Sequence, residues 1–178
     1  MNPTELNTLR RSLWLTREQA GQLNGMTERS WRYLEDGTRA IPQDVQARMR
    51  GLDAAASAMA DAVWDEHFNL SAKTGDLKHV TTALLRYACA ADLVAAHPDM
   101  AGVPVDLHAA AIDRARQQLE GEGATVRIVL FDSAAYREWI AGNGLADNPA
   151  SRAAWAASAT DPTPKVGGVQ ASGEEIST

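Results

Sequence analysis

The sequence has little cysteine and no long apolar run. Cys89 is the single cysteine among 178 residues, which excludes an internal disulfide and argues against a cysteine-based metal site. We interpret it as a small, buried apolar residue. No stretch reaches the roughly eighteen apolar residues of a membrane span, and the first residues lack the basic start and apolar core of a signal peptide. We therefore expect a cytoplasmic protein.

The motifs of common enzymes are also missing. The chain has no P-loop, no Gly-x-Ser-x-Gly and no His-Glu-x-x-His sequence. Its histidines, scattered 12, 18 and 11 residues apart, do not indicate a shared metal site. We therefore predict a protein that is not an enzyme, binds no metal and needs no cofactor. The histidines are His67, His79, His97 and His108.

Charge is unevenly distributed along the chain. The net charge is -6, yet residues 1–50 hold eight basic side chains against six acidic ones, which leaves -8 for the rest. All eight are arginine, whose planar guanidinium suits bidentate contacts with phosphate and guanine. This distribution indicates a head that binds a polyanion, attached to an acidic body.

Residues 1–68 are predicted to form a helix-turn-helix bundle of four to five helices. Each of the first three helices follows a threonine, a residue type that often caps the start of a helix. Only a few residues separate the second helix from the third, so the two axes must cross sharply. The expected caps are Thr4, Thr16 and Thr27, with the second helix over residues 17–23 and the third over 28–36.

Further helical segments are predicted after Pro42. This proline opens a fourth helix, since its fixed φ suits the first helical position. The alanine-rich residues 54–68 either continue that helix or form a second one in line with it. Polar and turn-forming residues at 69–76 then mark the boundary of the head.

Residues 77–159 are predicted to form a small α/β domain. Residues 125–131 are the clearest strand, whereas 80–87 fits either a strand or the start of a helix that continues to Ala96. Residues 160–178 lack large apolar groups apart from isolated ones, and we expect a disordered tail. The predicted fold class is thus mainly α, with a small C-terminal α/β (α+β) domain. Further helices are expected at 107–119, after a cap at Asp132 or Ser133, and at 149–159.

Three glycines stand where a helix-turn-helix requires them. Gly21 puts almost no side chain at the crossing of the second and third helices, and Gly25 permits the positive φ of the tight turn. Gly37 occupies the place of a left-handed stop after the third helix. Trp31 and Leu34 are expected to supply the core beneath this motif.

The outward side of the third helix carries the candidates for DNA contact. Arg29 and Arg32 lie opposite the apolar face, and their side would meet base edges in a major groove. Arg17 and Arg39 flank this helix and are placed for phosphates. Glu28 is either a specificity residue that accepts from cytosine or a helix-start charge. The candidate set is Arg17, Thr27, Glu28, Arg29, Ser30, Arg32, Tyr33 and Arg39.

This spacing, over residues 13–37, resembles the Cro/C1-type (XRE) helix-turn-helix family. Gly21 stands where that family usually has alanine, and Gly25 matches its turn glycine. Arg10 and Glu35 match a pair that forms a salt bridge between the first and third helices in relatives. The resemblance therefore implies a structural role for both residues.

A closer resemblance is to the anti-CRISPR-associated autorepressors and their relatives. It is carried by residues 4–11, by the stretch Thr27-Glu-Arg-Ser-Trp-Arg-Tyr-Leu-Glu-Asp-Gly and by Ile41-Pro-Gln-Asp-Val. The resemblance implies a compact C-terminal dimerisation domain and binding to an inverted repeat in a promoter, with Arg29 as the base-reading residue.

We therefore expect a homodimeric repressor that binds a palindromic double-stranded DNA operator. One head alone has too few cations to bind DNA tightly at physiological salt, so two heads are needed. Two alternatives stay open. One is a protein interaction module, antitoxin-like or adaptor-like, whose acidic body suits a basic partner. The other is a regulator that binds RNA.

Overall fold

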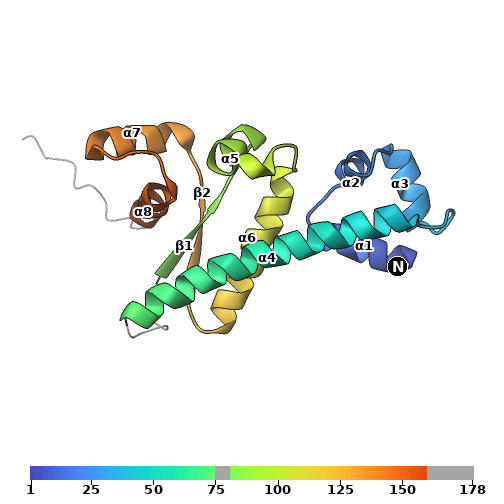
Figure 1. The fold of residues 1–178 in the computed structure, drawn as a ribbon, viewed down its shortest axis with the longest axis horizontal. Helices are drawn as coiled ribbons and strands as arrows, with labels where there is room; N and C mark the ends of the chain where they lie inside the picture. The colour runs from blue at the N-terminus through green and yellow to red at the C-terminus, as the bar shows by residue number, and fades with distance from the viewer. Residues whose placement is uncertain (75–80, 160–178) are drawn as a thin grey trace, which may run out of the picture.

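One long helix, α4 (Gln43–Thr74), connects the two ends of the molecule. Helices α1 to α3 lie at one end, and the strands with α7 and α8 lie at the other (Figure 1). The structure is a computed structural model that describes residues 1–74 and 81–159. The predicted tail at 160–178 and His79 lie outside these residues. The predicted fold class, mainly α with a small C-terminal α/β part, is confirmed.

The head begins with three short helices in the predicted order. Thr16 and Thr27 cap the second and third of them by accepting a hydrogen bond from a backbone N–H three residues later. The helices are α1 (Pro3–Ser12), α2 (Arg17–Leu23) and α3 (Glu28–Glu35).

The predicted cap of the first helix is wrong. Asn2, not Thr4, caps α1, and its side chain accepts from the backbone N–H of Glu5 at 2.8 Å. The Glu5 carboxylate accepts in turn from the backbone N–H of Asn2, which completes a capping box. Pro3 occupies the first turn, where its missing N–H costs nothing, and this moves the helix start ahead of Thr4.

Helix α4 is continuous over 32 residues. It therefore includes both segments predicted after Pro42, and it crosses most of the boundary expected at 69–76. Alanine has the highest helix propensity, and the alanine-rich middle of α4 favours this continuity. No helix within the described ranges is long and apolar enough to cross a membrane.

The C-terminal half contains a parallel pair of strands joined through helices. Strand β1 (Thr81–Arg86) pairs with β2 (Thr125–Leu130) in a register that places Leu84 opposite Ile128. Most of the segment predicted at 80–87 is therefore strand, over residues 81–86, and a separate helix follows it, because parallel pairing requires a long crossover. The elements are β1 (Thr81–Arg86), α5 (Ala90–Ala96), the short 3-10 helix η1 (Pro98–Met100), α6 (Val105–Gly121), β2 (Thr125–Leu130), α7 (Ser133–Asn143) and α8 (Pro149–Ala159).

Helices cover both faces of this two-stranded sheet. On one face Leu84 packs in a buried cluster with Leu119 of α6 and residues of α4. On the other face Leu85 packs in a cluster that contains Phe131 and Trp155 of α8. The alternation of side chains along a strand thus fills two separate cores.

Helix α6 also completes the core of the head. Leu107 and Ala111 belong to the same buried cluster as Trp31. Beside them, the side-chain amide of Gln19 in α2 donates to Asp106 at 2.7 Å. The head is therefore packed directly against the C-terminal half.

The expectation for Cys89 is wrong. This residue is exposed, and its thiol donates to the carboxylate of Asp92 at 3.3 Å. It is the residue immediately before α5. Ala88, Ala90 and Ala91 around it are exposed as well, so the connection between β1 and α5 faces solvent at this point.

Candidate nucleic-acid interface

Three glycines set the geometry of the helix-turn-helix. A Cβ on Gly21 would lie 2.9 Å from the backbone oxygen of Met26 and 3.2 Å from that of Thr27, so even alanine would push α2 and α3 apart. Gly25 has φ +67° and Gly37 has φ +74°, values that favour glycine. The close crossing and both turns therefore depend on these positions.

A buried carboxylate ties the three head helices together. The side chain of Glu35 is only 1% exposed. Its oxygens accept from Arg10 Nε at 2.6 Å, Arg17 Nε at 2.7 Å, Trp31 Nε1 at 2.8 Å and Asn7 Nδ2 at 2.9 Å. The Arg10–Glu35 ion pair is the one that the sequence resemblance implied, while Asn7 and Trp31 are additional donors that the sequence did not indicate.

These donors keep Glu35 ionised. Burial alone would raise the pKa of the carboxyl, but the hydrogen bonds from Arg10, Arg17 and Trp31 outweigh it and lower the pKa to about 2. The fixed negative charge in turn holds both arginine side chains in place. The network therefore fixes how α3 is presented relative to α1 and α2.

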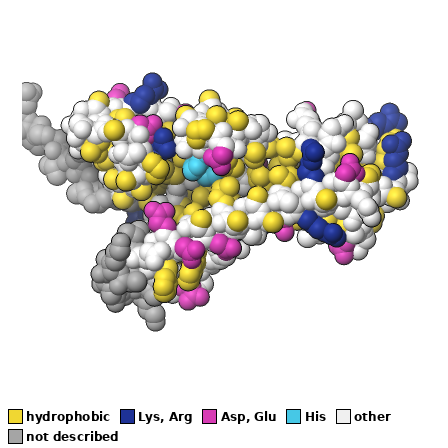
Figure 2. Space-filling view, viewed as in Figure 1, with side chains coloured by type: hydrophobic (Ala, Val, Ile, Leu, Met, Phe, Trp, Pro, Cys, Tyr) yellow, Lys and Arg dark blue, Asp and Glu magenta, His cyan; other side chains and the backbone are white. Residues whose placement is uncertain are grey.

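On the outward side of α3, two arginines pack against one tyrosine. Arg29 Nε donates to the Tyr33 hydroxyl at 2.9 Å, and its guanidinium carbon lies 5.8 Å from the ring centroid. The guanidinium carbon of Arg39 lies 5.2 Å from the same ring. Both arginines are exposed, and Figure 2 shows basic side chains gathered at this end of the molecule. Tyr33 thus orders two exposed cations by cation–π contact.

Arg32 and Glu28 occupy successive turns of the same helix face. Arg32 Nη2 lies 3.7 Å from Glu28 Oε1, and both side chains are about half exposed, at 53% and 51%. An exposed pair at this spacing contributes little to stability. Either side chain can therefore leave the other for a ligand at small cost.

Thr27 and Ser30 form the start of α3. The Thr27 hydroxyl oxygen accepts from the backbone N–H of Ser30 at 3.2 Å, and the hydroxyl donates to Ser30 Oγ at 3.1 Å. Both side chains therefore already serve the helix cap. Any contact with a ligand here would have to share these hydroxyl groups.

Arg17 differs from the other candidates because its partner, Glu35, is a buried carboxylate. The hydrogen bond and charge of Glu35 raise its pKa, and its side chain remains 36% exposed. Arg17 therefore belongs to the buried network as well as to the surface beside α3.

Two features of the structure could not be seen in the sequence. Arg48, an exposed residue of α4, donates from Nη1 to the backbone oxygen of Leu23, which places its cation at the end of α2. In the C-terminal half, the rings of His97 and His108 lie 5.5 Å apart although the sequence indicated scattered histidines. The part of the chain that the structure describes holds no group of three or more metal-ligating side chains.

Comparison with known proteins gives one family. A family model described as Aca2/YdiL-like matches residues 1–98, which is more than half of the chain and includes the whole head. A search of the curated proteins found no match.

Proposed function

Because the chain belongs to the Aca2/YdiL-like family of anti-CRISPR-associated helix-turn-helix regulators, we propose that it is a sequence-specific repressor of transcription that acts on its own promoter. The observation that carries this proposal is the set of exposed guanidinium groups around α3, held by Arg29, Arg32 and Arg39. Helix α3 would enter the major groove of double-stranded DNA with this side facing the bases. The protein would repress transcription by binding to DNA in the cytoplasm, and it would catalyse no reaction.

The residues around α3 would divide the work of recognition. Arg29 is the base-reading residue, because it is exposed in the first turn and its guanidinium suits the acceptor pair of guanine. Arg39 and the exposed part of Arg17 would contact phosphates on either side. Arg32 would read or flank a guanine with Arg29, which leaves Glu28 free to accept from a cytosine amino group.

Two copies would bind one palindromic operator. Ile128 and Leu130 of β2 remain 38% and 62% exposed, and no strand lies beside the outer edge of β2 within the described ranges. Such an apolar strand edge is suited to contact with a second copy. The two recognition helices would then read half-sites about 34 Å apart. Light scattering should give twice the monomer mass, and a monomer at micromolar concentration would contradict this part of the proposal.

A mobility-shift titration tests the DNA-binding role. The probe is the inverted repeat found by footprinting DNA upstream of the gene. Arg29→Ala should weaken binding to that operator by about 1–3 kcal/mol, since a bidentate base contact is lost. Arg137→Ala is the matched control, because Arg137 is exposed on α7 far from the head and donates to the carbonyl of Ser133. Equal affinities for the two variants would exclude Arg29 as a base-reading residue.

A salt series separates this proposal from its alternatives. Binding to DNA releases counterions and must weaken steeply as salt is raised, whereas an apolar protein contact need not. Competition of labelled operator DNA with structured RNA separates DNA from RNA binding. Salt-independent binding or complete displacement by RNA would overturn the proposal.

A further inference from the structure

Tyr33 lies one helical turn after Arg29 on the outward side of α3. Residues four apart in a helix are neighbours on its surface, so the phenol and the guanidinium can meet. Arg29 Nε donates to the Tyr33 hydroxyl at 2.9 Å, and its guanidinium carbon lies 5.8 Å from the ring centroid. Tyr33 is partly buried, whereas Arg29 is exposed. The partly buried ring therefore restricts the long, exposed side chain.

The hydroxyl leaves one particular edge of the Arg29 guanidinium for a ligand. A guanidinium can pair with two acceptors through Nη1 and Nη2, or through Nε and one of these nitrogens. Because Nε already donates to Tyr33, the second mode would require this bond to break. The terminal edge, formed by Nη1 and Nη2, is thus the one presented, and it suits the adjacent O6 and N7 acceptors of guanine.

Tyr33 also connects α3 to the loop that carries Arg39. Its backbone oxygen accepts from the backbone N–H of Arg39 at 3.0 Å. The guanidinium carbon of Arg39 lies 5.2 Å from the centroid of the Tyr33 ring. The face of an aromatic ring attracts a cation, and this contact limits the orientations of a long side chain. The hydroxyl of Tyr33 thus acts on Arg29, and its ring acts on both arginines.

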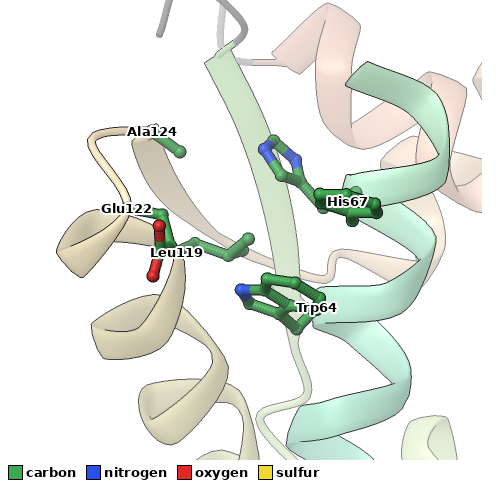
Figure 3. A pocket seen from close by; sticks show the side chains of 6 residues that line it. Trp64, His67, Leu119, Glu122 and Ala124 are labelled. Atoms are coloured by element: carbon green, nitrogen blue, oxygen red, sulfur yellow. The ribbon is translucent and has the colours of Figure 1, made fainter. Parts of the chain in front are cut away.

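Trp64, near the C-terminal end of α4, has aromatic and apolar neighbours instead. Its ring stacks on Phe68 with the centroids 5.1 Å apart, and Figure 3 shows it pointing toward Leu119 of α6. The hollow between Trp64 and Leu119 has a volume of about 40 Å³, close to that of one or two water molecules. Trp64 thus contributes to packing, whereas Tyr33 orders charged groups at the surface.

Order in the free protein matters because binding otherwise has to supply it. Immobilising a long side chain at an interface reduces affinity by about two- to tenfold, and a side chain that is already fixed avoids most of this loss. Arg32, the other arginine of α3, lies 3.7 Å from Glu28 in an exposed pair, which restrains it weakly. Arg29 is therefore the arginine of α3 whose geometry is better defined before DNA binds.

We propose that Tyr33 is a positioning residue for DNA recognition: its hydroxyl fixes Arg29 for reading guanine, and its ring holds Arg39 for a phosphate. This inference rests on the proposed function. It assigns discrimination between sequences to the hydroxyl, and part of the general affinity for DNA to the ring. Removal of the hydroxyl and removal of the ring should therefore have different effects.

NMR relaxation of the arginine Nε–H groups in the free, full-length protein tests the first step without DNA. Tyr33→Phe keeps the ring and removes the hydroxyl, so the order parameter of the Arg29 Nε–H group should fall below its wild-type value. Tyr136→Phe is the matched control, because it removes a hydroxyl that donates to Asp147 in the C-terminal half. It should leave Arg29 unchanged. Equal order parameters for Arg29 in the wild type and Tyr33→Phe would overturn the proposal.

Mobility-shift titrations test the second step with two duplexes. One is the footprinted inverted repeat, and the other has the same composition with both half-sites scrambled. Tyr33→Phe should weaken binding to the repeat about fivefold and to the scrambled duplex less than about twofold. Tyr33→Leu, which also removes the ring, should weaken both and make binding less dependent on salt, since Arg39 is released from its place. Tyr136→Phe should change neither.

A double-mutant cycle with Arg29→Ala separates positioning from direct contact. Once the Arg29 guanidinium is absent, Tyr33→Phe should change affinity for the repeat less than about 1.5-fold. An undiminished effect in that background would mean that the hydroxyl itself contacts DNA, and it would overturn the proposal, as would unchanged binding of Tyr33→Phe to the repeat. Equal binding of the wild type to both duplexes would instead overturn the proposed function, and with it the recognition role of Tyr33, even where Arg29 had lost order as expected.

Discussion

Glu35 in the head and His108 in the C-terminal half are both buried polar side chains, yet their surroundings are opposite. Glu35 accepts from four side chains, whereas His108 Nδ1 has no partner among the described residues. The environment of Glu35 favours its charged form, and that of His108 favours its neutral form. The comparison separates a polar group that maintains the fold from one that lowers the stability of the fold.

Glu35→Ala should have the largest effect on stability. It leaves the guanidinium of Arg10, whose side chain is 11% exposed, without its carboxylate, and a buried unpaired charge costs about 3–5 kcal/mol. The free energy of unfolding, measured by urea denaturation, should fall by this amount. Glu18→Ala, on the exposed side of α2, is the control and should change it by less than about 0.5 kcal/mol. If Glu35→Ala lowered the free energy of unfolding no more than Glu18→Ala, the Glu35 network would not stabilise the head.

Acidification should destabilise the protein in two successive ranges of pH. The pKa of His108 is lowered to about 4 in the folded protein, so the unfolded chain takes up this proton at a higher pH than the folded protein does. The free energy of unfolding should therefore fall as the pH is lowered from about 6.5 to 4. The stability from Glu35 is present above about pH 4.5 and is lost as the pH falls toward 2. Across each of these two pH ranges, the free energy of unfolding should fall by about 3 kcal/mol.

Comparison with His108→Phe isolates the upper range. His67 and His97 also have pKa values lowered by burial, but they titrate in both proteins and cancel in the difference. Urea denaturation at a series of pH values should show the wild type losing more stability than the variant above pH 4. Parallel curves for the two proteins would mean that the His108 ring is accessible to protons in the folded state.

The smallest effect is expected at neutral pH, where His108→Phe should stabilise the protein. Removal of an unpaired buried nitrogen should raise the free energy of unfolding by about 1–2 kcal/mol. Trp31→Phe is the matched change at the satisfied site, and it should lower the stability because Glu35 loses a donor. Thermal denaturation should show a higher melting temperature for His108→Phe and a lower one for Trp31→Phe. A lower melting temperature for His108→Phe would contradict the view that His108 destabilises the fold.

Most of the head could be predicted from its sequence because its determinants are local. Thr16 and Thr27 cap helices that begin at the next residue. Gly21 allows the close helix crossing, and Gly25 takes up the positive φ of the turn, each at its own position. The cap of α1 was predicted wrongly because Thr4 and Asn2 are both good capping residues, and Pro3 decided between them.

The C-terminal half could be predicted less well because its determinants are far apart in the sequence. Residues 81–86 form a strand because β2 pairs with them, although α5 and α6 intervene in the sequence. His97 and His108 meet because one ends α5 and the other lies in α6, a contact that linear spacing does not encode. The Glu35 network is an intermediate case, in which the resemblance implied Arg10 and the fold added Asn7.

Because helix α4 is continuous, a small rotation at one of its ends produces a large displacement at the other. At 1.5 Å per residue its 32 residues span about 48 Å, so a tilt of about 5° at one end displaces the other by about 4 Å. That displacement exceeds the spacing of one base pair. In the proposed dimer, a small change in the angle between the two α4 helices would therefore move each head away from its half-site. The protein should accordingly tolerate only a narrow range of spacings between the two half-sites of its operator.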